Sequence, residues 1–127
     1  MKKIVAIVAI LMLALQANAA MSYKDAIAQN DRKPMAVLVY ANWAQNYDYT
    51  LTMYRKMQSS LGNLYNYVEL DLASAEAKDY TEDFAIMPKL PYIMLYRGKG
   101  KFQRLLDRNC ATDLNCAIPK MKSFSRQ

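Results

Sequence analysis

Few side chains in this chain could carry redox or nucleophilic chemistry. Cys110 and Cys116 are the only cysteines among the 127 residues, and the chain contains no histidine. Without histidine, Ser-His and Cys-His nucleophile pairs are excluded, and the commonest transition-metal ligand is missing. Two cysteines alone do not make a structural zinc site. We therefore expect no metal site and no cofactor.

The two cysteines are predicted to form a disulfide with each other. The short segment between them lets the two Cα atoms approach to the roughly 4.4–6.8 Å that a disulfide requires. An even number of cysteines in an oxidising compartment favours such a bond. A structural role for Cys110 and Cys116 is favoured. The alternative is a displaced redox pair, in which Lys101, Arg104 and Arg108 would lower a thiol pKa.

Residues 1–19 have the pattern of a signal peptide. Two lysines precede an apolar run from 4 to 15, and the small residues Ala17 and Ala19 precede the expected cleavage site. This run is too short to span a bilayer, and no later stretch is long enough, so we expect no transmembrane segment after cleavage. We therefore predict export to a bacterial periplasm or to the medium, with residues 20–127 as one domain.

The rest of the chain alternates predicted helices and strands. Apolar residues at helical spacing predict helices, and short apolar, β-branched runs predict strands. The helices are expected at residues 23–29, 50–61, 74–84 and 119–124. The strands are expected at residues 35–41, 67–72, 92–96 and 101–106. Ser22 and Ser74 are the predicted caps of two of the helices. This order predicts an α/β domain with a mixed sheet that helices cover on both faces.

Several segments resemble the thioredoxin superfamily in their order and spacing. Lys33-Pro34, an apolar strand and Ala41-Asn42-Trp43 are similar to the family's approach to its active site. Residues 68–71, Val-Glu-Leu-Asp, resemble its strand ending in Asp. Residues 90–99 resemble its strand that begins with an apolar residue and proline, and the hairpin that follows. The resemblance covers nearly all of residues 20–127. It implies a thioredoxin-like fold with a four-stranded mixed sheet whose first strand is short or absent.

The resemblance breaks down at the active site. Where the family has Cys-x-x-Cys after its tryptophan, this chain has Ala44-Gln45-Asn46-Tyr47. Ala44 supplies no nucleophile, and the phenol of Tyr47 cannot form a disulfide. The family's buried acid, which assists proton transfer, corresponds to Leu38 in this chain. We therefore predict no thioredoxin activity at this loop.

The resemblance also implies a peptide-binding groove that persists without the redox chemistry. In the family, the proline that corresponds to Pro91 is cis, and neighbouring backbone groups are free to pair with an extended peptide. Trp43, Tyr47, Leu90, Pro91 and Tyr92 are expected to line this groove. Exposed aromatic side chains suit peptide binding. The alternative interpretation is that the aromatic side chains of this loop only fill space over the start of a helix.

The charge is unevenly distributed along the chain. Residues 97–127 contain eight Lys or Arg residues and two acidic ones, and the preceding domain sequence is nearly balanced. A basic end can bind an acidic partner or an anionic membrane surface, but scattered charges favour a solvated face. The leading prediction is an exported, non-catalytic thioredoxin-like protein that binds a protein or peptide partner and no nucleic acid. The alternatives are a thiol–disulfide oxidoreductase that uses Cys110 and Cys116, and a structural subunit of an envelope assembly.

Overall fold

The computed structural model describes residues 20–84 and 88–127, so the predicted signal peptide at residues 1–19 lies outside the described residues. The helices are α2 (Tyr23–Ala28), α3 (Tyr47–Leu61), the 3-10 turn η1 (Gly62–Leu64), α4 (Glu76–Asp83), α5 (Arg108–Ala111) and α6 (Leu114–Ser125). The strands are β1 (Met35–Tyr40), β2 (Asn66–Asp71), β3 (Tyr92–Arg97) and β4 (Phe102–Leu106). Within the described ranges, none of the helices has the length and apolar character needed to cross a membrane.

The four strands form one mixed sheet in the order β2-β1-β3-β4, which confirms the predicted sheet. β1 pairs in parallel with β2, so that Val37 lies beside Val68, and antiparallel with β3, so that Val37 also lies beside Met94. β3 and β4 form an antiparallel hairpin. Because β1 is central and covered on both faces, all its residues from Met35 to Val39 are fully buried.

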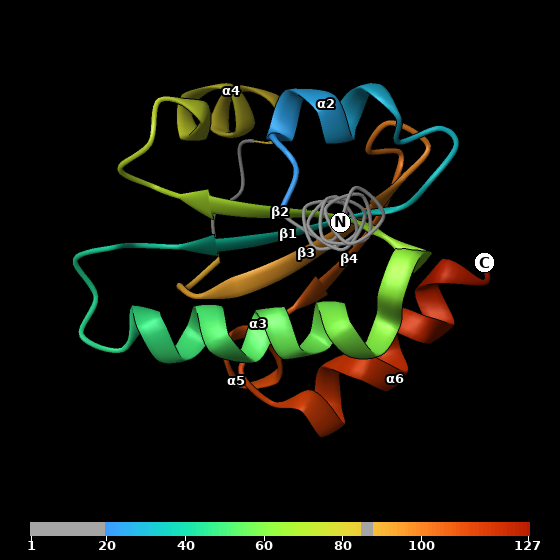
Figure 1. Ribbon diagram of the computed structural model, residues 1–127. Helices are drawn as coiled ribbons and strands as arrows, with labels where there is room; N and C mark the ends of the chain where they lie inside the picture. Colours follow the sequence, from blue (N-terminus) through green and yellow to red (C-terminus); the bar gives the residue numbers. More distant parts are fainter. Residues whose placement is uncertain (1–19, 85–87) are drawn as a thin grey trace, which may run out of the picture.

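Helices cover both faces of the sheet: α3, α5 and α6 pack on one face, and α2 and α4 pack on the other (Figure 1). Side chains alternate along a strand, so successive residues of β1 face opposite helical layers. The hydroxyl of Tyr54 in α3 donates to the carbonyl of Ala36 at 2.7 Å and fastens α3 to the sheet. The hydroxyl of Tyr65 donates to the carbonyl of Met121 at 2.7 Å and fastens α6 to the end of the α3 segment.

The face under α2 and α4 contains a cluster of buried tyrosines. The hydroxyl of Tyr80 lies 2.6 Å from that of Tyr96 and 3.4 Å from that of Tyr92. Tyr23 packs edge-on against Tyr80, with 5.5 Å between the ring centroids, and its hydroxyl donates to the carboxylate of Asp83. Burial raises the pKa of each of these four phenols above the ordinary value of 10. The cluster is therefore neutral at physiological pH.

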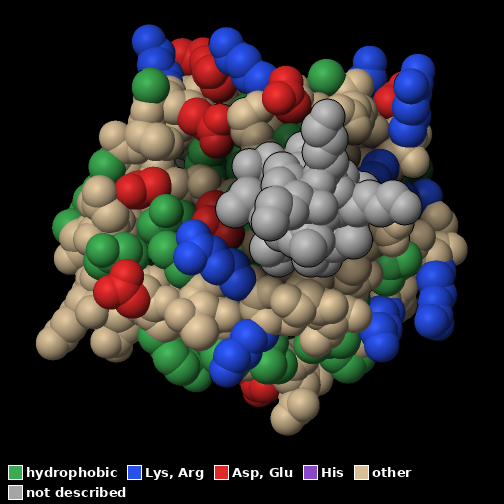
Figure 2. Space-filling view, in the orientation of Figure 1, with side chains coloured by type: hydrophobic (Ala, Val, Ile, Leu, Met, Phe, Trp, Pro, Cys, Tyr) green, Lys and Arg blue, Asp and Glu red, His purple; other side chains and the backbone are tan. Residues whose placement is uncertain are grey.

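A buried asparagine joins two loops at the end of the sheet where β1 begins and β3 ends. The side-chain amide of Asn30 donates to the carbonyls of Tyr96 at 2.9 Å and Lys33 at 3.3 Å, and its oxygen accepts from the N–H of Gly100 at 3.1 Å. Its backbone carbonyl accepts from the N–H of Gly98 at 3.1 Å. Asn30 therefore holds the α2–β1 loop against the β3–β4 turn. Lys and Arg side chains gather at this end, along the right-hand margin of Figure 2.

The C-terminal helical region differs from the prediction. A helix was expected only from residue 119 to 124, but α5 precedes it, and α6 begins at Leu114 and contains Pro119. Aspartate caps explain both helix starts. The side chain of Asp113 accepts from the N–H of Asn115 at 3.0 Å, and that of Asp107 accepts from the N–H at position 110 at 3.1 Å.

Of the two predicted serine caps, one is confirmed and one is wrong. The side chain of Ser22 accepts from the N–H of Asp25 at 3.2 Å and caps α2. Ser74 does not cap α4, which begins two residues later at Glu76. Its hydroxyl instead donates to the carbonyl of Asp71 at 2.6 Å, because this segment forms a turn directly after β2.

Candidate functional site

The loop after β1 and the first turn of α3 form an edge rich in aromatic side chains. Trp43 is 66% exposed and Tyr49 is 57% exposed. The ring of Tyr47, the first residue of α3, is stacked on that of Tyr40 at the end of β1, with 6.4 Å between centroids and 9° between planes. We call these four residues, Tyr40, Trp43, Tyr47 and Tyr49, the aromatic edge. The predicted groove did not include Tyr40 and Tyr49, which flank the Trp43 loop at the end of β1 and in the first turn of α3.

The proline segment lies next to the aromatic edge. Val39 pairs with Tyr92 across β1 and β3, so Pro91 lies beside the end of β1, and the Leu90–Pro91 peptide bond is cis. Leu90 and Pro91 are half-buried. The expectation that the Tyr92 side chain lines the groove needs correction. This side chain is fully buried among the tyrosines under α2 and α4, because the first residue of β3 faces that layer.

A hollow of about 400 Å³ adjoins this segment. It is lined by Pro88 and Lys89, just before the cis bond, and by residues 107–109, where β4 passes into α5. β4 ends beside the start of β3, since Leu106 pairs with Ile93. The proline segment therefore has the aromatic edge on one side and a polar hollow on the other.

The aromatic edge contains none of the groups needed for disulfide exchange. Ala44 is exposed, and its N–H donates to the carbonyl of Ala41 at 3.1 Å in a turn. Leu38, which corresponds to the buried acid of the thioredoxin superfamily, is fully buried in the core. In residues 20–84 and 88–127 no cysteine is free, because Cys110 and Cys116 are bonded to each other. This arrangement offers apolar contact surface without a redox-active thiol.

The predicted disulfide between Cys110 and Cys116 is confirmed, with 5.2 Å between the Cα atoms. Cys110 lies in α5 and is 4% exposed, whereas Cys116 lies in the first turn of α6 and is half-buried. Both pack against the core between the sheet and α3. The bond thus joins the short helix α5 to the first turn of α6 on the face that α3 covers.

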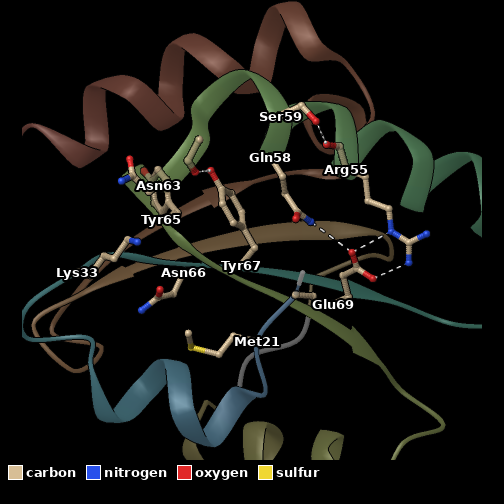
Figure 3. Close-up of a pocket in the computed structure, with 12 residues that line it drawn as sticks. Met21, Lys33, Arg55, Gln58, Ser59, Asn63, Tyr65, Asn66, Tyr67 and Glu69 are labelled. Atoms are coloured by element: carbon tan, nitrogen blue, oxygen red, sulfur yellow. Dashed lines mark hydrogen bonds and ion pairs between the residues drawn. The ribbon is translucent and has the colours of Figure 1, made fainter. Parts of the chain in front are cut away.

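A second cavity, of about 500 Å³, lies between α3 and the outer side of β2 (Figure 3). Arg55 and Gln58 point from α3 toward Glu69 on β2. The Arg55 guanidinium donates to the Glu69 carboxylate at 2.8 and 3.1 Å, and the Gln58 amide donates at 3.3 Å. This hydrogen bonding to Glu69 raises the pKa of Arg55. These three hydrogen bonds fasten α3 to β2.

The part of the chain that the structure describes brings together no group of three or more His, Cys, Asp or Glu side chains that could hold a metal ion. The features with defined geometry among the described residues include the aromatic edge, the polar cavity beside β2 and the disulfide. Of these, the aromatic edge alone presents large apolar side chains to solvent.

Comparison with known proteins identifies the fold. No family model and no curated protein matches the sequence. Among solved structures, thioredoxin f from spinach chloroplast is 13% identical, with a TM-score of 0.61 over 83% of this chain and 86% of that one. The oxidised thioredoxin from Plasmodium falciparum is 15% identical, with a TM-score of 0.62 over 85% and 94% of the two chains. Full-length ERdj5 is 13% identical with a TM-score of 0.68, over 93% of this chain and 18% of that one. At these identities the likeness establishes the architecture, and the described chain has the thioredoxin-like fold.

Proposed function

We propose that this protein is an exported, non-catalytic thioredoxin-like protein that binds an extended segment of a partner protein at the aromatic edge. The observation that carries the proposal is the 66% exposure of Trp43 beside a loop that contains no cysteine. When a partner covers a large apolar ring that is exposed to water, the removal of its surface from water contributes favourably to the free energy of binding. The surface is thus suited to binding, and the thiol that thioredoxin chemistry requires is missing from it.

The neighbourhood of Trp43 supports a peptide partner in particular. Tyr47 and Tyr40 stack on each other and form a wall beside the loop, and Tyr49, two residues further along α3, is also exposed. Rigid aromatic side chains are enriched among the residues that dominate binding energy, because little rotamer entropy is lost when they are covered. The half-buried Pro91 segment runs alongside this wall. An extended chain placed there would contact both.

Export is the second part of the proposal. The signal-peptide pattern of residues 1–19 and the Cys110–Cys116 disulfide support an oxidising compartment, since such bonds persist outside the reducing cytosol. We place the protein in a bacterial periplasm or in the medium on these grounds. Fractionation of cells that express the full chain tests this placement.

The binding proposal is tested by selecting random peptides displayed on phage against the protein, then titrating a selected synthetic peptide. Trp43 is the only tryptophan in the chain, so its fluorescence reports directly on this edge. We expect a blue shift as the indole leaves water. By calorimetry, Trp43→Ala should weaken binding by about 30-fold, as expected for a central aromatic contact.

The matched control is Phe102→Ala, because Phe102 is also an exposed aromatic residue, 59% exposed, and lies at the opposite end of the sheet. It should leave peptide affinity unchanged. Selection of no peptide, or equal affinity of the wild type and Trp43→Ala, would show that the aromatic edge is not a binding surface.

One observation favours a second candidate, a thiol–disulfide oxidoreductase that uses Cys110 and Cys116. Cys116 is half-buried in the first turn of α6, and a helix N-terminus stabilises a thiolate. In this scheme the reduced Cys116 thiolate attacks a substrate disulfide, and Cys110 resolves the mixed disulfide. Insulin reduction by dithiothreitol separates the candidates. Turnover above background that is lost in Cys116→Ser would establish the oxidoreductase and refute the non-catalytic proposal.

A further inference from the structure

The end of the sheet opposite the aromatic edge carries a dense group of basic side chains. The α2–β1 loop, the β3–β4 turn and the end of α6 meet there (Figure 1), and Lys and Arg line this margin of the molecule (Figure 2). We call this surface the basic end, and it consists of Arg32, Lys33, Arg97, Lys99, Lys101, Lys122 and Arg126. Basic residues that are far apart in the sequence thus lie on one surface of the folded protein.

Two contacts hold the basic end together. The hydrogen bonds of Asn30, which is 2% exposed, tie the loop that carries Lys33 to the turn that carries Lys99. The guanidinium of Arg97 lies over the ring of Phe124 in α6, 5.8 Å from its centroid, and this contact joins the hairpin to the last helix. The basic residues therefore lie on a preformed surface of three fixed segments.

Among the residues that the structure describes, no ion pair neutralises the positive charge of this surface. The ion pairs found in residues 20–84 and 88–127 are Lys24–Asp79 and Arg55–Glu69, and neither involves the basic end. Asp31 is the acidic residue within the α2–β1 loop, so positive charge dominates there. A surface of this kind attracts anions over about 8–10 Å at physiological salt.

An exposed aromatic ring stands among these charges. Phe102, the first residue of β4, is 59% exposed, and the guanidinium of Arg97 lies 5.7 Å from its ring centroid. This cation–π contact holds the ring at the surface, next to Lys101. Basic side chains around an exposed phenyl ring are the combination that binds the interface of an anionic bilayer, where the ring enters the acyl boundary and the charges meet the headgroups.

We propose that the basic end docks the protein on a membrane surface containing anionic phospholipid, with Phe102 inserted at the interface. Phe102 favours a membrane over a soluble polyanion, because a polyanion needs only the charges and gains nothing from an apolar ring. The proposal does not depend on peptide binding, since the aromatic edge lies at the other end of β1 and β3. Docked in this way, the protein would turn the aromatic edge away from the bilayer.

The test is co-sedimentation of the full chain with vesicles of phosphatidylethanolamine, with or without phosphatidylglycerol. We expect stronger binding to the vesicles that contain phosphatidylglycerol than to those that do not, and weaker binding to them as salt is raised. The double variant Lys99→Gln/Lys101→Gln should bind about 30-fold more weakly, because each basic residue near an anionic leaflet contributes about fivefold. Phe102→Ala should bind about tenfold more weakly.

The matched control is Lys56→Gln/Lys78→Gln, which removes the same charge from exposed positions on α3 and α4. All variants share one N-terminal segment, so differences among them isolate the basic end. Equal binding to both kinds of vesicle, or an equal loss in the control, would refute the proposal. Binding to soluble polyphosphate that matches vesicle binding and ignores Phe102→Ala would also refute it, since it would show a polyanion site.

Discussion

Reduction of the Cys110–Cys116 disulfide is expected to lower the melting temperature by about 10 °C. The bond closes a short loop, since its cysteines are six positions apart in the sequence. Loop-closure entropy for such a loop is worth about 2–2.5 kcal/mol at 25 °C. A loss of 1 kcal/mol lowers the melting temperature by about 4–8 °C in a domain of 60–100 residues, and by the lower value in a slightly larger one. Multiplying the loop-closure free energy by this change in melting temperature per kcal/mol gives the expected loss of about 10 °C.

The position of the bond explains why α6 depends on it. Pro119 lies within α6 and has no N–H, so it cannot donate to the carbonyl of Asn115 four residues earlier. The first turn of α6 is therefore weakly connected to the rest of the helix. The disulfide and the Asp113 cap hold this turn in place. We expect Pro119→Ala to narrow the difference in melting temperature between the oxidised and reduced proteins by about half, because alanine restores the missing donor.

The assay is calorimetry of the oxidised protein and of the protein reduced by dithiothreitol. The double variant Cys110→Ala/Cys116→Ala, measured without reductant, should melt with the reduced wild type, which separates loss of the bond from effects of the reagent. A reduced protein that melts within about 2 °C of the oxidised one would refute a structural role, because the bond would then contribute far less to the free energy of unfolding than loop closure predicts.

Three further predictions concern stability. Because the pKa values of Tyr80, Tyr92 and Tyr96 are raised and these phenols are protonated in both the folded and the unfolded state well below pH 10, their contribution leaves stability constant there. Stability should fall above pH 10 by about 1.4 kcal/mol per pH unit for each phenol, because the unfolded chain then loses protons first; thermal melts across the alkaline range check this. Asn30→Ala should lower the free energy of unfolding by about 2–3 kcal/mol in urea titrations, because the carbonyl of Tyr96 and the N–H of Gly100 would lose the hydrogen bonds they make with the Asn30 side chain. Trp43→Ala should change that free energy by less than about 0.5 kcal/mol, because the ring is mostly in water.

The strands could be predicted from the sequence because their signals are local. The apolar, β-branched run that contains Val37 admits few interpretations, and the strand bounds differ from the prediction by one residue or less. The predicted helix begins too late because proline suits a first helical position, although Asp113 offers a cap six positions before Pro119. A side-chain cap and a proline compete for the helix start, and here the cap prevails.

The candidate site was predictable only in part. The exposure of Trp43 and the pairing of the two cysteines follow from residue type and spacing. The burial of Tyr92 does not, because alternation along a strand gives two faces without saying which of them meets the tyrosine layer. Asn30 was equally hidden, since the partners of its side chain lie 66 and 70 positions away at Tyr96 and Gly100. A local sequence pattern cannot predict contacts between residues that are so far apart in the sequence.

The shared hydroxyl of Tyr80 has a consequence for how this protein can change over evolutionary time. Because Tyr80 contacts the hydroxyls of both Tyr92 and Tyr96, a single change to phenylalanine at position 80 would leave two buried hydroxyls without that partner. Replacing all three by phenylalanine would leave none. A lineage moving between these two cores must pass through a less stable intermediate. The three positions are therefore epistatic, and we expect descendants to keep or lose the hydroxyls as a set.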